Sequence, residues 1–134
     1  MSKHSSTLLI AEENAETLHL WRDLFEGQGF NVLAAEDGTA AWQLFKSWSF
    51  LIRAVLIGDL MQPPLDGLDL IRRLHRLPIV VATSYGLDYV LLAKTAGATA
   101  VMRKFDEVDR LVETINQVRL DPIRFTPQWV LPTK

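Results

Sequence analysis

Short apolar runs alternate with amphipathic helical stretches along most of this chain, and this alternation constrains the fold more than any other feature. Apolar runs at residues 8–11, 31–35, 53–58, 79–83 and 99–103 are bounded by turn-forming residues and predict buried β-strands. Apolar residues at helical spacing predict helices at residues 15–27, 40–48, 68–74, 89–96 and 108–118. Residues 54–57 are apolar throughout, as in a central strand that is covered on both faces.

Strands that alternate with helices are joined by right-handed crossovers, which place helices on both faces of a parallel sheet. We therefore expect an α/β fold of the flavodoxin-like, doubly wound class, with five parallel strands in the order 2-1-3-4-5. At 134 residues the chain fits one such domain, which we place at residues 7–120. Residues 121–134 contain three prolines together with Phe125 and Trp129, and they predict a non-helical tail or a linker.

Polar residues follow four of the predicted strands at the point where each strand ends. Glu12 and Glu13 follow the first strand, Asp59 follows the third, Thr83 closes the fourth, and Lys104 follows the fifth. Open parallel sheets bind ligands outside the carboxyl ends of their strands, where the strand order reverses, so these side chains are expected to meet in one crevice. Three carboxylates, a hydroxyl and an ammonium are groups that bind a hard cation and a phosphoryl group.

Composition excludes several classes of function. The formal net charge of −2 provides no general electrostatic basis for binding nucleic acid. The absence of cysteine excludes disulfides, thiolate metal ligands and a cysteine nucleophile. No apolar run is long enough to span a membrane, and the first seven residues lack the apolar core of a signal peptide, so we expect a cytoplasmic protein.

Several motifs occur together, in register over the length of one domain. They are the acidic pair Glu12-Glu13, Asp-Leu-Met-Gln-Pro-Pro-Leu-Asp-Gly at residues 59–67, Pro-Ile-Val-Val-Ala-Thr-Ser at 78–84, Ala-Gly-Ala at 96–98, and Lys104 after the last strand. From about Leu8 to Val118 the chain therefore resembles the receiver domain of two-component response regulators, in an atypical form. The resemblance implies a signalling phosphoacceptor and not an enzyme in the ordinary sense.

The resemblance also implies a role for each polar residue at the strand ends. Asp59 is the expected phosphoacceptor, which takes a phosphoryl group from a histidine kinase or a phosphotransfer protein and later loses it to water. Mg²⁺ is the expected cofactor, and Thr83 and Lys104 are expected to bind the phosphoryl oxygens. The expected metal ligands are Glu12, Glu13, Asp59 and the backbone carbonyl of Met61.

Four positions depart from the family's pattern. Glu13 is one methylene longer than the usual aspartate, which bears on the geometry of a Mg²⁺ site. Gly58 replaces a larger apolar residue before the phosphoacceptor. Phe105 stands where the family has a proline, so the peptide bond between Lys104 and Phe105 is expected to be trans. Val101 occupies the switch position, where the family has an aromatic residue that turns inward when the threonine moves.

Three residues near the phosphoacceptor are expected to modulate its chemistry. Ser84 is small, as the phosphoryl pocket of the family requires, whereas Tyr85 is bulky. We hypothesise that Tyr85 and Met61 flank the acyl phosphate and slow its attack by water.

Two alternatives to a phosphorylated switch remain at this point. Glu13, Phe105 and Val101 also fit a pseudo-receiver, which is an interaction module of the same fold without phosphoryl transfer. A Mg²⁺-dependent phosphohydrolase resembling haloacid dehalogenases is disfavoured, because those enzymes carry a second aspartate at the position of Met61.

The resemblance implies partners as well. Phosphorylation would alter binding to a downstream protein that the sequence does not identify, with no direct contact to nucleic acid or membrane. The helix at residues 89–96, the strand at 99–103 and the helix at 108–118 correspond to a surface through which a homodimer is expected by resemblance.

Overall fold

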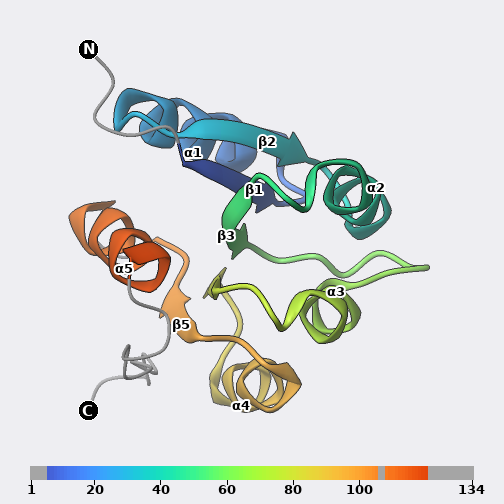
Figure 1. Cartoon of the computed structure of the whole chain (residues 1–134). Helices are drawn as coiled ribbons and strands as arrows, with labels where there is room; N and C mark the ends of the chain where they lie inside the picture. Colours follow the sequence, from blue (N-terminus) through green and yellow to red (C-terminus); the bar gives the residue numbers. More distant parts are fainter. Residues whose placement is uncertain (1–5, 106–107, 121–134) are drawn as a thin grey trace.

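The computed structural model describes residues 6–105 and 108–120, and these residues form a five-stranded parallel sheet flanked by helices (Figure 1). The strands lie in the order β2-β1-β3-β4-β5, which confirms the predicted order. The order reverses after β2, so that β1 lies between β2 and β3. The strands are β1 (Thr7–Ala11), β2 (Asn31–Ala35), β3 (Ile52–Ile57), β4 (Ile79–Thr83) and β5 (Ala100–Arg103).

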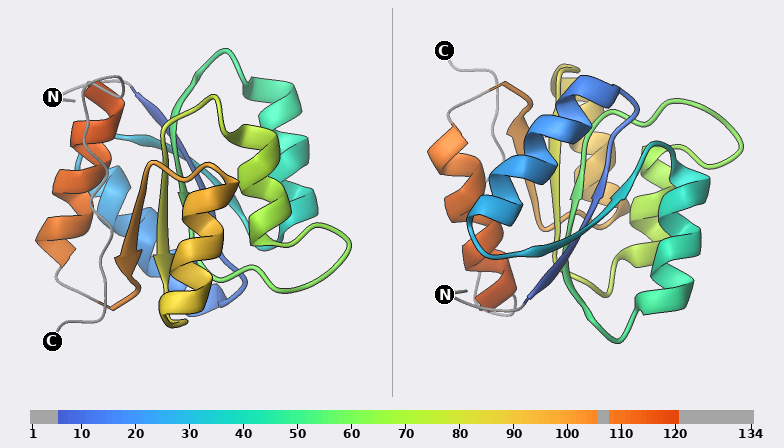
Figure 2. Two further views of the ribbon diagram at one scale, coloured as in Figure 1. Left: turned by 90° about the horizontal axis from the view of Figure 1, so that it is seen from below. Right: turned by 90° about the horizontal axis from the view of Figure 1, so that it is seen from above.

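Helices cover both faces of this sheet (Figure 2). One face is covered by α1 (Ala15–Gly27) and α5 (Val108–Leu120). The other face is covered by α2 (Gly38–Trp48), α3 (Gly67–Leu74) and α4 (Leu87–Ala96). This arrangement is the doubly wound α/β fold that the alternation of strands and helices predicts.

Two apolar cores result from the alternation of side chains along each strand. On β1, Leu8 and Ile10 pack in the core beneath α1 and α5, whereas Leu9 and Ala11 pack in the core beneath α2, α3 and α4. Both cores exclude water from the strands, so consecutive residues of a central strand are apolar. The two cores hold the strand ends, and the polar residues on them, at fixed separations.

Side-chain caps begin three of the helices and so define where the intervening loops end. Asn14 accepts a hydrogen bond from the backbone N–H of Thr17 at 2.8 Å and caps α1 as expected. Asp37 and Asp66 cap α2 and α3 in the same way. Gly97 ends α4 with a φ of 125°, a conformation that favours glycine.

The end of β3 differs by one residue from the predicted strand at 53–58. β3 ends at Ile57, and Gly58 lies in the loop that carries Asp59. Gly58 still donates its N–H to the carbonyl of Ala11 at 2.8 Å, but the next N–H, that of Asp59, bonds to a side chain instead of the neighbouring strand. The carboxylate of Glu12 therefore replaces the backbone hydrogen bonds of the sheet at Asp59.

The predicted tail at residues 121–134, with Trp129, lies outside the described residues. Within residues 6–105 and 108–120, none of the helices has the length and apolar character needed to cross a membrane.

Candidate functional site

The carboxyl ends of four strands bring the predicted polar side chains together. Glu12 follows β1, Asp59 lies two residues beyond β3, Thr83 ends β4, and Lys104 follows β5. The backbone N–H of Lys104 donates to the carbonyl of Thr83 at 2.9 Å and holds the last two of these residues side by side. Residues from distant parts of the sequence thus form one cluster at this edge of the sheet.

The Asp59 carboxylate lies at the centre of the cluster, and only 8% of the residue is exposed. Its Oδ1 accepts a hydrogen bond from the hydroxyl of Thr83 at 2.6 Å. Its Oδ2 accepts bonds from the hydroxyl of Ser84 at 2.6 Å and from the backbone N–H of Ser84 at 3.1 Å. The Lys104 ammonium is 3.4 Å from the same oxygen. Both carboxylate oxygens are therefore held by donors from β4 and β5.

These contacts decide the charge of the Asp59 carboxyl. Burial alone would raise its pKa, because burial disfavours the charged form. The hydrogen bonds from Ser84 and Thr83, with the charge of Lys104, outweigh burial and hold the pKa below the usual value of 3.8. Asp59 is therefore ionised at neutral pH, which is the nucleophilic form of a carboxyl group.

We expect the stability of the protein to depend on acid through Asp59. The pKa of this group is lower in the folded than in the unfolded chain, so its stabilising contribution is present above pH 3.8 and is lost as the pH falls through the folded value. Urea unfolding of the wild type should show this loss below about pH 4. The Asp59→Asn variant should lack that part of the pH dependence, and an identical acid profile in both proteins would contradict the assignment.

Lys104 bridges two buried carboxylates. Its Nζ is 2.9 Å from Glu12 Oε1 and 3.4 Å from Asp59 Oδ2, and its side chain is 7% exposed. The Phe105 ring lies beside it, with its centroid 5.7 Å from Nζ, and is itself exposed. Among the described residues the only cis peptide bond is Pro63-Pro64, so the Lys104–Phe105 peptide bond is trans, as expected. The ammonium reaches the site without the proline of the family.

Glu12 is almost fully buried, and both of its carboxylate oxygens are engaged. Oε1 accepts from the backbone N–H of Asp59 at 3.0 Å and contacts Lys104, and Oε2 accepts from the backbone N–H of Asn14 at 2.7 Å. Glu12 therefore ties the start of α1, the backbone of Asp59 and Lys104 to one carboxyl group.

Glu13 has different contacts. Its Oε2 accepts hydrogen bonds from the backbone N–H groups of Met61 and Gln62, both at 2.7 Å. These bonds connect the end of β1 to the loop that follows Asp59. In the part of the chain that the structure describes, no group of three or more acidic or histidine side chains is placed to hold a metal ion. By type, the carboxylates of Glu12, Glu13 and Asp59 remain suitable ligands for Mg²⁺.

Comparison with known proteins identifies the family. The family model of the response regulator receiver domain matches residues 8–116. The chain belongs to the response regulator receiver domain family. Receiver domains are signalling domains of two-component systems and not classical enzymes.

Curated relatives and solved structures agree with this assignment. Response regulator GtcR of Aneurinibacillus migulanus is 30% identical over 87 residues, which are 63% of this chain and 35% of GtcR. Transcriptional regulatory protein CpxR of Escherichia coli K12 is 34% identical over 89 residues, or 63% of this chain and 37% of CpxR. The receiver domain therefore spans about a third of the length of these relatives. A solved receiver domain from Clostridium thermocellum superposes with a TM-score of 0.79 at 24% identity, covering 87% of this chain and 96% of its own.

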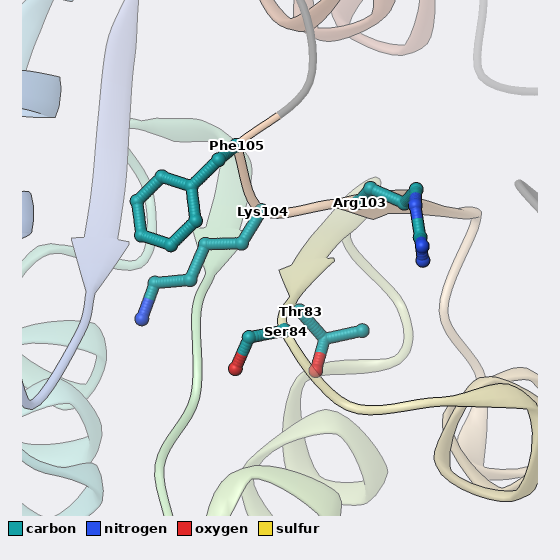
Figure 3. Close-up of a pocket in the computed structure, with 5 residues that line it drawn as sticks. All are labelled: Thr83, Ser84, Arg103, Lys104 and Phe105. Atoms are coloured by element: carbon teal, nitrogen blue, oxygen red, sulfur yellow. The ribbon is translucent and has the colours of Figure 1, made fainter.

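The receiver domain has a cavity of about 310 Å³ beside Asp59, lined by Thr83, Ser84, Arg103, Lys104 and Phe105 (Figure 3). Figure 3 shows the Lys104 side chain reaching along the Phe105 ring, and Ser84 between the Lys104 ammonium and Thr83 in this view. Arg103 extends away from that ammonium. The hydrogen-bond donors of this receiver domain thus lie on the wall of an open space next to Asp59.

Two tyrosines connect Thr83, at the end of β4, to α4. The N–H of Tyr85 donates to the hydroxyl oxygen of Thr83 at 3.0 Å, and the Tyr85 ring lies 5.7 Å from that of Tyr89. The Tyr89 hydroxyl is buried and has no hydrogen-bond partner among the described residues. Burial, with the charges of Asp59 and Asp66, raises the pKa of Tyr89 to about 12. The sequence predicts Tyr89 only on an apolar helix stripe, and its hydroxyl lies beside Gly67 at the start of α3, a neighbour that local spacing does not indicate.

Val101, at the predicted switch position, is fully buried in the core beneath α2, α3 and α4. It pairs with Val81 in the parallel ladder between β4 and β5. An aliphatic side chain of this size occupies the core and leaves no aromatic ring at this position to turn inward or outward.

Proposed function

We propose that this receiver domain is a phosphorylated switch in which Asp59 takes a phosphoryl group from a sensor histidine kinase or a phosphotransfer protein. The observation that carries the proposal is the Asp59 carboxylate itself. It is buried, ionised at neutral pH, and surrounded by the hydroxyls of Thr83 and Ser84 and the ammonium of Lys104. Such donors stabilise the charge on a transferring phosphoryl group.

The transfer balances as a displacement at phosphorus. A carboxylate oxygen of Asp59 attacks the phosphorus of the donor's phosphohistidine, and the phosphorus–nitrogen bond breaks with its electron pair on the imidazole. The donors that now hold the Asp59 oxygens, from Thr83, Ser84 and Lys104, become available to the phosphoryl oxygens. Water later attacks the phosphorus, which releases inorganic phosphate and restores the Asp59 carboxylate.

Mg²⁺ is part of the same proposal. Glu12, Glu13, Asp59 and the carbonyl of Met61 supply the hard oxygen atoms that this ion prefers, so the residue types fit. When bound, Mg²⁺ neutralises charge on the phosphoryl oxygens. Glu13 now accepts hydrogen bonds from two N–H groups of the loop after Asp59, and we expect it to exchange at least part of these bonds when it acts as a ligand.

The test is the intact mass of the protein after incubation with acetyl phosphate. We expect the wild type to gain one phosphoryl group in the presence of Mg²⁺ and to gain none in the presence of a chelator. Asp59→Asn is the matched control, because it preserves the size of the side chain and removes the nucleophile. No gain in the wild type at high Mg²⁺ would reject the switch and favour the pseudo-receiver.

We also propose that Tyr85 and Met61 shield the acyl phosphate from water. Both side chains are partly exposed, at 47% for Tyr85 and 38% for Met61, and both lie in the loops that follow β4 and β3 at the site. Tyr85→Ala should shorten the lifetime of phosphorylated Asp59 several-fold, whereas Tyr85→Phe preserves the bulk of the ring and should leave it near the wild-type value. The measurement is the decay of the phosphorylated mass over time. An equal lifetime in Tyr85→Ala would reject this role.

The proposed output is a change in protein contacts, in the cytoplasm, at the surface of α4, β5 and α5. Thr83 and Ser84 hold Asp59 directly, and the loop after them leads into α4. Three leucines of α4 are exposed: Leu87, Leu91 and Leu92. This surface is proposed for a downstream protein or for a second copy of the chain.

Neither alternative function is favoured. A pseudo-receiver has no need of hydrogen-bond donors around Asp59. In this protein Thr83, Ser84 and Lys104 all contact Asp59, which favours phosphoryl transfer over a pure interaction module. A phosphohydrolase of the haloacid dehalogenase type requires an acid at position 61, where Met61 stands.

A further inference from the structure

Gly58 directly precedes the phosphoacceptor, and the space that its side chain would occupy is filled. A Cβ atom placed on Gly58 would lie 1.8 Å from Oε1 of Glu12 and 2.9 Å from Cδ of the same residue. It would also lie 3.0 Å from Cζ3 of Trp21 on α1. The carboxyl group of Glu12 therefore lies in the gap that the glycine leaves beneath Trp21.

The oxygen that fills this gap also organises the site. Oε1 of Glu12 accepts the backbone N–H of Asp59 at 3.0 Å and lies 2.9 Å from the Lys104 ammonium. The ammonium is 3.4 Å from Asp59, so its shorter contact is with Glu12. Oε2 is held by the N–H of Asn14. A shift of Glu12 away from Gly58 would disturb the Asp59 backbone and Lys104 together.

We infer that Gly58 and Glu12 form a size-matched pair that positions Lys104 and the backbone of Asp59 for phosphoryl transfer. Glu12 has one methylene more than an aspartate, and the absence of a side chain at Gly58 accommodates the reach of that longer arm. Glu12 is a positioning residue, because its carboxylate holds Lys104 and the backbone of Asp59 in place. Gly58 contributes by leaving the space that this carboxylate occupies. The part of this inference that concerns phosphoryl transfer rests on the proposed function.

The inference predicts that two individually harmful substitutions compensate each other. Gly58→Ala places a methyl group where Oε1 now lies and displaces the Glu12 carboxylate. Glu12→Asp shortens the arm, so that the carboxylate no longer reaches Asp59 N–H and Lys104 in the same way. In the double variant Gly58→Ala/Glu12→Asp, the shorter arm leaves room for the methyl group, and a shorter carboxylate can lie outside the gap.

The experiment compares the wild type, both single variants and the double variant in two measurements. The first is the rate of phosphorylation by acetyl phosphate at saturating Mg²⁺, followed by intact mass. We expect Gly58→Ala to slow phosphorylation on the order of tenfold to a hundredfold, as for misplaced catalytic groups, and the double variant to be faster than Gly58→Ala, because the shorter arm leaves room for the methyl group. Gly86→Ala is the matched control, since a Cβ there meets no atom within 4 Å. Its rate should equal that of the wild type.

The second measurement is the free energy of urea unfolding, which requires no phosphoryl transfer. If Gly58 and Glu12 are a size-matched pair, the double variant should lose less free energy of unfolding than the sum of the losses in the two single variants. Losses that simply add, or a Gly58→Ala variant with wild-type rate and stability, would overturn the inference. If Gly58→Ala does not fold, folding of the double variant supports the pair and its failure to fold overturns it. If the wild type takes no phosphoryl group, the proposed function fails, while the unfolding data still decide the pair.

Discussion

Replacing Lys104 by methionine is expected to destabilise the receiver domain by about 3–5 kcal/mol at neutral pH. Methionine preserves the apolar length of the side chain but removes the ammonium that contacts Glu12 and Asp59. Both carboxylates are buried, so each would retain its charge without its cationic partner. Removing one partner of a buried ion pair costs far more than removing a surface charge, because the remaining charge is not solvated.

The free energy of urea unfolding measures this effect, and Arg76→Met, which removes an exposed cation, is the control. The control should change stability by less than about 1 kcal/mol. Lys104→Met should also slow phosphorylation by acetyl phosphate roughly a hundredfold, as the loss of one charge-stabilising donor commonly does. Equal stability of Lys104→Met and Arg76→Met would show that the Glu12 and Asp59 carboxylates do not depend on the ammonium.

Gly38→Ala is expected to produce the second large effect, a loss of about 2–3 kcal/mol in the free energy of unfolding. A Cβ on Gly38 would lie 2.0 Å from the backbone carbonyl oxygen of Leu65 and 2.9 Å from its carbonyl carbon. The obstacle is backbone and not the end of a flexible side chain, so either the start of α2 or the loop before α3 must shift. The same loop carries Met61, whose N–H bonds to Glu13.

Gly27→Ala is the matched control for this substitution. Gly27 is the last residue of α1, and a Cβ there meets no atom within 4 Å. Because alanine favours a helix over glycine, Gly27→Ala should be neutral or stabilising by up to about 1 kcal/mol. The same measurement of urea unfolding checks both variants. A loss in Gly27→Ala as large as that in Gly38→Ala would mean that the contact between the new methyl group and Leu65 is not the cause of the destabilisation.

The contacts of Ser84 and Tyr89 could not be predicted in full from the sequence. Ser84 is expected, as a small residue of the pocket, to modulate the chemistry of Asp59, and in the structure its hydroxyl and its N–H both bond to Asp59. Its place directly after Thr83, at a strand end, was the available signal for that role. The spacing of Tyr89 carried no such signal, because it equally fits a residue that packs on the core beneath α4. Its hydroxyl is buried beside Gly67 at the start of α3, and this neighbour depends on how α4 packs against α3.

The two glutamates show the same limit. Their role as metal ligands stays a prediction, and in the structure the two side chains have separate partners. Glu12 contacts Lys104 and the N–H of Asp59, which is 47 residues away in the sequence, whereas Glu13 holds the N–H groups of Met61 and Gln62. Which of two adjacent side chains turns inward depends on where the next strand's loop passes, and a local pattern does not contain that information.

The alternation of strands and helices predicted the fold class, from which the strand order was expected, and the placement of Glu12, Asp59, Thr83 and Lys104 at one edge of the sheet. Apolar periodicity is local, and parallel sheets place all their carboxyl ends on the same edge, so a linear pattern is sufficient for this placement. The linear pattern does not contain the atoms that meet at this edge, including the carboxylate of Glu12 in the gap at Gly58, which were found from the folded chain. Such contacts depend on ångström-scale separations between residues far apart in the chain, which packing of the two cores sets.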